Sequence, residues 1–552
     1  MVGKFLRNFS KHWKVNGRSD LTDFSPVWLR MESALDAYPP GGDIEYRLRQ
    51  ADGALRFVYT DLVATNAGNY LITDAASYGS SFTKNAYEAD TIAIPDVVGV
   101  PLSSDFLSRI ASDPNKGVIL VEAAKPAFFP LVLEVWTNDV KVLETPLRLS
   151  ILGVQNMYRW INLRHVTSGK EKRITRTVSP LNYPDNISNG KQVVFVHGFN
   201  VDEKKAEAWG SEIFKRLYQS GSRAMYTAVT WQGDEDPLIG LMPAAAYYHL
   251  DVINAFQVAS ALVSEVTDLP GQKYVAAHSL GNMVVSSAIR DHGFNPARYF
   301  MIDAAVAMEA YKSSAYEPLD IAEPPWPSYT NRLWASEWYK LFDESDGRHD
   351  FTWRGRFGNI PQAVNYYSSG EDVLKNNEKH ESMLITGVER SWIYQEKIKG
   401  RLQTTILRRV TSHGGWGFNN DYNVFNLITM PADQAALITT NQLRANSFFK
   451  RFYEDGLYGS DGSTVASIPY VRAKVLAEAI PATSRATGRN EVGGYFGDNN
   501  IDLMKKMKNG WPLKRITQDD PDGRWFHSDS KNVAYPYVYK FFDDMVYKLN
   551  ED

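Results

Sequence analysis

The sequence predicts an α/β domain with a mostly parallel β-sheet, preceded by a smaller domain of antiparallel strands. Two observations lead to this division. Short apolar segments separated by Gly, Pro, Asn and Asp turns occupy residues 27–155, whereas apolar segments alternate with amphipathic helices after residue 191. An alternation of strands and helices is typical of a parallel sheet that is covered by helices on both faces.

The composition is typical of a folded globular protein with more than one domain. The chain has 552 residues, of which 44% are hydrophobic and 22% are charged. The net charge of −4 gives no reason to expect a nucleic acid partner. The absence of cysteine excludes disulfides, thiolate catalysis and cysteine-based zinc sites.

The expected compartment follows from the same observations. A chain of this length without cysteine favours a secreted or periplasmic protein over a cytoplasmic one. Residues 1–26 read as an N-terminal extension that lacks the apolar core of a signal peptide, so either the protein is cytoplasmic or a leader has been removed. No apolar run approaches the roughly 18 residues that a membrane helix needs.

Residues 27–155 are predicted to form an accessory β-sandwich of the immunoglobulin type. The apolar segments VWLRMES, IEYRLRQ, RFVYTDLVA, VILVEA, LVLEVWT and TPLRLSIL supply its strands. This region contains no histidine and no carboxylate cluster with the spacing of a metal site, so we expect it to carry no chemistry. Residues 156–190 are polar and rich in turn signals, which predicts a connection between the domains.

The predicted α/β domain begins at residue 191. Strands are expected at 192–200, 224–231, 273–279 and 298–306, and helices at 201–221, 248–271 and 280–293. A further strand, AVNYY, precedes Ser368, and residues 532–549 form an amphipathic helix at the end of the chain.

Ser279 lies at the junction of a strand and a helix, in the segment AHSLG. Ligands of parallel sheets bind beyond the carboxyl ends of the strands, where this serine falls. The pentapeptide is a small-residue variant of the G-x-S-x-G elbow, with Ala277 and Gly281 at the positions where larger side chains would collide with the neighbouring strand and helix. A serine that only caps a helix is the alternative interpretation.

Residues 191–310 resemble the α/β-hydrolase superfamily of esterases and lipases. The motifs that carry the resemblance are VVFVHGFN, TWQG, the helix YYHLDVINAFQVASALVSEV and VAAHSLGNMVV. The resemblance implies that Ser279 is a nucleophile and that backbone N–H groups of Leu280 and of Phe199 or Asn200 form an oxyanion hole. His197 is expected to brace its loop, and the His278 side chain is expected to point away from the nucleophile.

The resemblance also implies that an acid and then a histidine follow the serine along the chain. Asp372, after a strand that breaks at Ser-Ser-Gly, is the expected acid. Adjacent Glu371 and the strand-end Asp303 are alternatives. His527 is the expected base because it alone stands directly before the closing helix. His413, followed by Gly-Gly, is the alternative base.

The catalytic domain is expected to span residues 191–552. Its segments at about 307–355 and 376–520 are longer than those of a minimal hydrolase, which predicts cap or lid insertions there. The expected function is a bacterial serine esterase, and possible subclasses are carboxylesterase, lipase and polyesterase. It would act on a small or polymeric ester through an acyl-enzyme and would need neither metal nor organic cofactor. A catalytically silent scaffold on the same fold, and an amidase or peptidase, are the alternatives.

Overall fold

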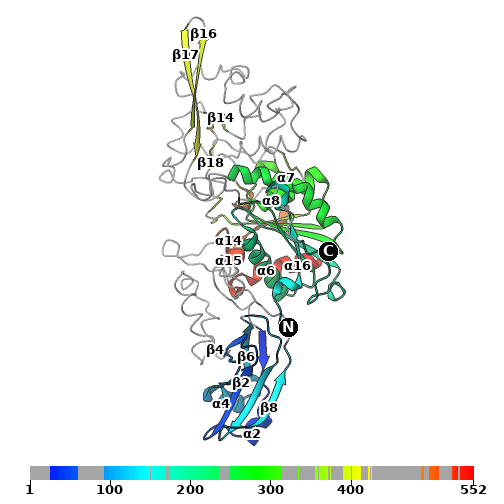
Figure 1. Cartoon of the computed structure of the whole chain (residues 1–552). Coiled ribbons are helices and arrows are strands. Elements are labelled where there is room, and N and C mark those ends of the chain that lie inside the picture. Colours follow the sequence, from blue (N-terminus) through cyan, green and yellow to red (C-terminus); the bar gives the residue numbers. More distant parts are fainter. Residues whose placement is uncertain are drawn as a thin grey trace.

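The computed structural model describes residues 25–59, 92–123, 125–149, 151–168, 175–234, 248–312, 333–334, 355–358, 360–370, 373–374, 390–398, 401–411, 421–422, 424–425, 486–489, 496–508, 525–532 and 535–551. The predicted acids Glu371 and Asp372 and the alternative base His413 lie outside the described residues. In Figure 1 the antiparallel domain forms one end of the molecule and adjoins the α/β domain.

The N-terminal domain consists of two four-stranded antiparallel sheets around one apolar core, as the sequence predicts. The first sheet has the order β1-β6-β3-β4 and the second β5-β2-β7-β8. The strands are β1 (Ser25–Trp28), β2 (Ile44–Gln50), β3 (Leu55–Tyr59), β4 (Ile92–Ala93), β5 (Val100–Pro101), β6 (Val118–Ala123), β7 (Leu131–Thr137) and β8 (Val140–Leu147).

Two details of this domain differ from the prediction. Helices α2 (Glu32–Ala37) and α4 (Ser104–Ser112) accompany the strands, and the hydroxyl of Ser103 caps α4 by accepting the backbone N–H of Phe106. The last strand also starts earlier than expected. Asn138 and Asp139 adopt positive φ and form a tight turn, which pairs β8 with β7 as a hairpin.

The α/β domain is built on a seven-stranded parallel sheet with the order β20-β15-β13-β12-β10-β11-β9. Its strands are β9 (Arg159–Asn162), β10 (Lys191–Val196), β11 (Met225–Thr230), β12 (Gln272–His278), β13 (Arg298–Ile302), β15 (Ala363–Tyr367) and β20 (Asn500–Asp502). Strand β12 is central, so the carboxyl ends of β10 and β13 flank the residue that follows it.

Helices cover both faces of this sheet (Figure 1). Helices α7 (Tyr248–Thr267) and α8 (Gly281–His292) pack on one face, and α6 (Glu203–Gln219) and α16 (Tyr535–Glu551) pack on the other. Alternate residues of β10 serve the two cores: Val194 and Val196 face α7 and α8, whereas Val193 and Phe195 face α6 and α16. The alternation of side chains along the strand thus supplies apolar residues to both cores.

Two short strands of the sheet lie where the sequence predicts other structure. Strand β9 belongs to residues 156–190, which were expected to form a connection, and β20 belongs to the stretch expected to form an insertion. These strands have four and three residues, too few for a recognisable pattern of burial. Residues 486–489 also belong to the core, because Ala486 bridges to Ala307 and Gly488 packs on Asp303.

Other described elements complete the chain. Strands β14 (Leu333–Trp334), β16 (Arg390–Ile398), β17 (Arg401–Thr411), β18 (Asp421–Tyr422) and β19 (Val424–Phe425) lie in the predicted insertions, and β16 and β17 form a long hairpin. The remaining helices are α5 (His165–Ser168), α14 (Leu503–Lys508) and α15 (Asp529–Asn532), with 3-10 turns at Pro114–Lys116, Val154–Met157, Asp185–Ile187, Met308–Ala310, Thr487–Arg489 and Gly497–Asn499. None of the helices in the described ranges is long and apolar enough to cross a membrane.

Candidate active site

Ser279 occupies a strained turn directly after the central strand β12. Its φ is +52°, its side chain is nearly buried, and α8 begins two residues later. A Cβ atom on Gly281 would lie 2.5 Å from the carbonyl oxygen of His197, and one on Gly198 would lie 2.7 Å from the Cβ of Ser279. The close approach of the two loops explains why the segment after Ser279 carries a glycine.

Positive φ angles in non-glycine residues gather at this site. Of five such residues in the part of the chain that the structure describes, two form the β7–β8 turn. The other three, Asn200, Ser279 and Asp303, follow the adjacent strands β10, β12 and β13. Each such angle costs roughly 1–3 kcal/mol, and residues of this kind cluster at functional sites. The strain therefore marks the carboxyl edge of the sheet as the candidate site.

Asn282 holds the elbow in this conformation. Its side-chain amide donates to the carbonyl oxygens of Ala277 (3.1 Å) and Ser279 (2.9 Å), and its Oδ1 accepts the hydroxyl of Tyr299 at 2.7 Å. The backbone N–H of Ser279 also donates to Ile302 in β13, over 3.0 Å. All these groups are buried, so the position of Ser279 is fixed by a satisfied polar network.

The two candidate oxyanion loops differ in which N–H groups are already used. The backbone N–H of Leu280 donates no hydrogen bond to any residue that the structure describes. The backbone N–H of Asn200 donates to the carbonyl of Gly233 at 2.5 Å. That bond occupies the Asn200 donor in this structure. Phe199 and Asn200 both line the pocket that contains Ser279.

His197 braces the loop after β10. Its Nδ1 donates to the carbonyl oxygen of Gly198 at 2.9 Å, and its Nε2 accepts the backbone N–H of Trp231 at 3.3 Å. The indole of Trp231 returns a hydrogen bond to the carbonyl of His197 at 2.8 Å. Burial lowers the pKa of His197 to about 3, so the ring is neutral. This arrangement agrees with the expected structural role.

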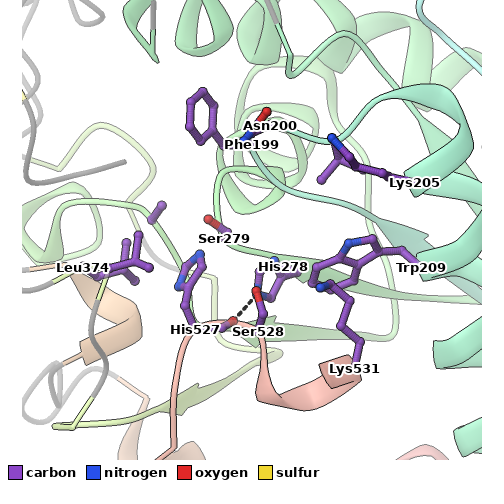
Figure 2. A pocket seen from close by; sticks show the side chains of 13 residues that line it. Phe199, Asn200, Lys205, Trp209, His278, Ser279, Leu374, His527, Ser528 and Lys531 are labelled. Carbon is purple, nitrogen blue, oxygen red and sulfur yellow. Dashed lines mark hydrogen bonds between the residues drawn. The ribbon is translucent and has the colours of Figure 1, made fainter. Parts of the chain in front are cut away.

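Ser279 and His527 line the same pocket, which has a volume of about 260 Å³. Figure 2 shows the serine hydroxyl and the imidazole projecting into it from β12 and from the loop before α15. The described residues that line the pocket are Phe199, Asn200, Val201, Lys205, Trp209, His278, Ser279, Ala305, Val373, Leu374, His527, Ser528 and Lys531. A hydroxyl and an imidazole in one pocket are the parts needed to activate a serine as a nucleophile.

The loop that carries His527 is anchored on both sides. On one side, the indole of Trp525 donates to the carboxylate of Asp303 (3.0 and 3.2 Å). The backbone carbonyl of Trp525 accepts the Ser368 hydroxyl at 3.0 Å. On the other side, the Arg216 guanidinium donates to the carbonyls of Ser530 and Lys531, both at 2.8 Å. These contacts join the loop to β13, β15 and α6, so the imidazole of His527 is presented by a rigid frame.

His278 contacts the same loop at His527 itself. Its Nε2 donates to the backbone carbonyl of His527 at 2.6 Å (Figure 2). The centroids of the two imidazole rings are 4.7 Å apart. Burial, together with the neighbouring His527, keeps the pKa of His278 well below its usual range, so the ring is neutral. The side chain points away from the serine hydroxyl, as expected, but its contact with the loop of His527 is one that the sequence did not reveal.

Of the three candidate acids, the structure describes only Asp303. Asp303 follows β13, is fully buried and lies against the loop of His527 through Trp525. Val373 and Leu374, which follow the expected acid Asp372, line the pocket with Ser279. Among the described residues there is no group of three or more His, Asp or Glu side chains that could hold a metal ion.

Two lysines in the pocket were also missed by the sequence analysis. Lys531, from α15, places its Nζ 4.2 Å from the ring centroid of Trp209, and Lys205 of α6 lines the same pocket. No sequence pattern links residues 205, 209 and 531, because 322 positions separate the last two. Only the fold brings them together.

Comparison with known proteins agrees with this geometry. Residues 193–395 match the family model described as "Alpha/beta hydrolase family". The curated proteins and the solved structures that were searched gave no match to the chain. Together with the seven-stranded parallel sheet and its helices, the match supports the α/β-hydrolase superfamily for this part of the chain. The predicted fold class and the resemblance are thereby confirmed.

Proposed function

We propose that the protein is a serine hydrolase that cleaves carboxylic esters through an acyl-enzyme, with Ser279 as nucleophile and His527 as base. The observation that carries the proposal is the strained position of Ser279, which shares one pocket with the imidazole of His527. The α/β-hydrolase fold supports hydrolase chemistry. The ester substrate is our inference from the serine at the nucleophile position, where a haloalkane dehalogenase would need an aspartate.

The proposed reaction has two halves. His527 takes the proton of Ser279 as the hydroxyl oxygen attacks the ester carbonyl. The N–H groups of Leu280 and of Phe199 or Asn200 stabilise the oxyanion. The tetrahedral intermediate collapses, and His527 returns the proton to the departing alkoxide. Water then attacks the acyl-enzyme by the same route and releases the acid. Each oxyanion donor contributes roughly 3 kcal/mol to the transition state.

We assign Asp372 as the acid that orients His527, with Asp303 as the alternative. Support for Asp372 comes from its neighbours Val373 and Leu374, which line the pocket. Support for Asp303 comes from its burial and from its contact with Trp525, two residues before His527. The two carboxylates follow adjacent strands, β15 and β13, so either arrangement is compatible with the sheet.

The direct test is hydrolysis of p-nitrophenyl acetate, butyrate and octanoate by the wild-type chain and by Ser279→Ala. We expect turnover by the wild type and a fall of about 10⁴- to 10⁶-fold in kcat in the variant, at an unchanged melting temperature. The matching p-nitroanilides distinguish an esterase from an amidase. A folded wild-type chain that hydrolyses none of these substrates would favour the silent scaffold.

A further inference from the structure

We propose that the pocket selects esters that carry a negatively charged group, a carboxylate, which Lys531 and Lys205 bind at one end of the pocket. This inference rests on the proposed ester hydrolysis at Ser279 and names the class of substrate. It concerns residues that the triad and the oxyanion hole do not use.

The two ends of the pocket differ in chemistry. In Figure 2, Lys205, Trp209 and Lys531 lie to the right of Ser279, whereas Leu374 lies to its left and Phe199 lies above it. Among the lining residues that the structure describes, none is acidic. A pocket with one cationic end and one apolar end matches a substrate that is charged at one terminus only.

Lys531 is held in place rather than free to move away. Its backbone carbonyl accepts the Arg216 guanidinium at 2.8 Å, and its ammonium lies 4.2 Å from the centroid of the Trp209 ring. A cation fixed over an aromatic ring is presented with little loss of side-chain entropy on binding. Lys205 is more exposed and pairs with Asp202 at 3.2 Å.

The acids near Lys531 already have other partners. Glu212 forms an ion pair with Lys215 and lies 3.6 Å from Arg216, and Asp529 accepts the backbone N–H of Phe526 at 2.8 Å. Both acids nevertheless favour the charged form of Lys531.

Burial, and then the charges of Arg216 and Lys205, disfavour the charged form of Lys531. They lower the pKa of Lys531 to about 7. A carboxylate beside the ammonium would favour its protonated form again.

The test compares esters that differ only in charge. On the acyl side, p-nitrophenyl hydrogen adipate is matched with p-nitrophenyl hexanoate, and on the alcohol side 4-acetoxybenzoate is matched with 4-acetoxybenzamide. We expect the wild type to prefer the anionic member of at least one pair. Lys531→Met should lower kcat/KM for that ester by about 10- to 100-fold more than kcat/KM for its neutral partner. Lys531→Arg should keep most of the preference.

The pH dependence adds a readout that packing alone would not move. Because the pKa of Lys531 is lowered to about 7, its charge is lost as the pH rises from 6 to 8.5. The ratio of kcat/KM for the anionic and neutral esters should therefore fall over that range in the wild type and stay flat in Lys531→Met. The same nucleophile and base act on both esters, so their contributions cancel from the ratio. His278 is neutral throughout because burial depresses its pKa.

The outcomes separate this inference from the proposed function. Lys540→Met, on α16 outside the pocket, is the matched control and should change neither ester. If neutral esters are hydrolysed and neither pair shows a preference that Lys531→Met removes, the inference is wrong and the esterase proposal stands. If the folded wild type hydrolyses neither the neutral nor the anionic esters, both fail.

Discussion

The imidazole of His278 donates a hydrogen bond of 2.6 Å to the backbone carbonyl of His527, so the residue before the candidate nucleophile holds the loop of the candidate base. The contact joins β12 to the segment before α15, two parts of the chain separated by 249 positions. One strand end thus positions both groups: Ser279 through the backbone turn and His527 through the neighbouring side chain.

Removing this contact should slow the reaction without removing the base. In His278→Ala, we expect kcat to fall by about 2- to 10-fold, because a hydrogen bond of this kind contributes about 0.5–1.5 kcal/mol net. KM should change little, since His278 is a positioning residue. His278→Gln, which can donate from its amide, should recover part of kcat. Equal loss in both variants, or a change in KM alone, would contradict the positioning role.

The assignment of the base is tested by two histidine variants. His527→Ala should lose about 10⁴-fold or more in kcat, and combining it with Ser279→Ala should cost little more, because the two residues act as a unit. His413→Ala should keep kcat within a few fold. An active His527→Ala enzyme beside an inactive His413→Ala enzyme would show that the alternative base is the correct one.

The acid is decided by a pair of isosteric variants. Asp372→Asn should lower kcat by about 10⁴-fold, because an amide presents the wrong hydrogen-bond donor to the imidazole. Asp303→Asn keeps an oxygen that can accept the Trp525 indole, so we expect it to retain kcat within about tenfold. Steady-state kinetics of both variants at one pH give the answer. The reverse pattern would assign the triad acid to Asp303.

Stability should fall on mild acidification because of two buried histidines. Burial lowers the pKa of His197 to about 3 and that of His278 well below its usual 6.5. Below pH 6.5 the unfolded chain therefore binds protons that the folded chain does not. Each histidine then costs about 1.4 kcal/mol of unfolding free energy per pH unit, down to its folded pKa. Urea unfolding at pH 7.5, 6.5 and 5.5 measures this loss, and an unfolding free energy that stays constant over this range would refute it.

Much of the α/β domain follows from patterns that are local in sequence. The segment from 191 to 306 alternates strongly apolar strands with amphipathic helices, so its elements and the place of Ser279 could be predicted. His527 could be proposed because the helix that follows it is long and periodic. In both cases the signal lies within about twenty residues.

The features that escaped prediction depend on contacts between distant segments. Strands β9 and β20 are too short to carry a pattern and exist because neighbouring strands pair with them. The hydrogen bond from His278 to His527 and the cation–π contact of Lys531 with Trp209 join residues that are far apart in the chain. Such relationships are set by tertiary structure, which overrides local propensity.

The central claim is that Ser279 is a nucleophile activated by His527, and the most direct measurement is mapping of a fluorophosphonate adduct by peptide mass spectrometry. The account predicts a single adduct on Ser279 in the wild-type chain. It also predicts that labelling is greatly slowed in His527→Ala and lost in Ser279→Ala, with all three proteins folded. An adduct on a different serine, or a folded wild-type chain that takes up no label, would contradict it.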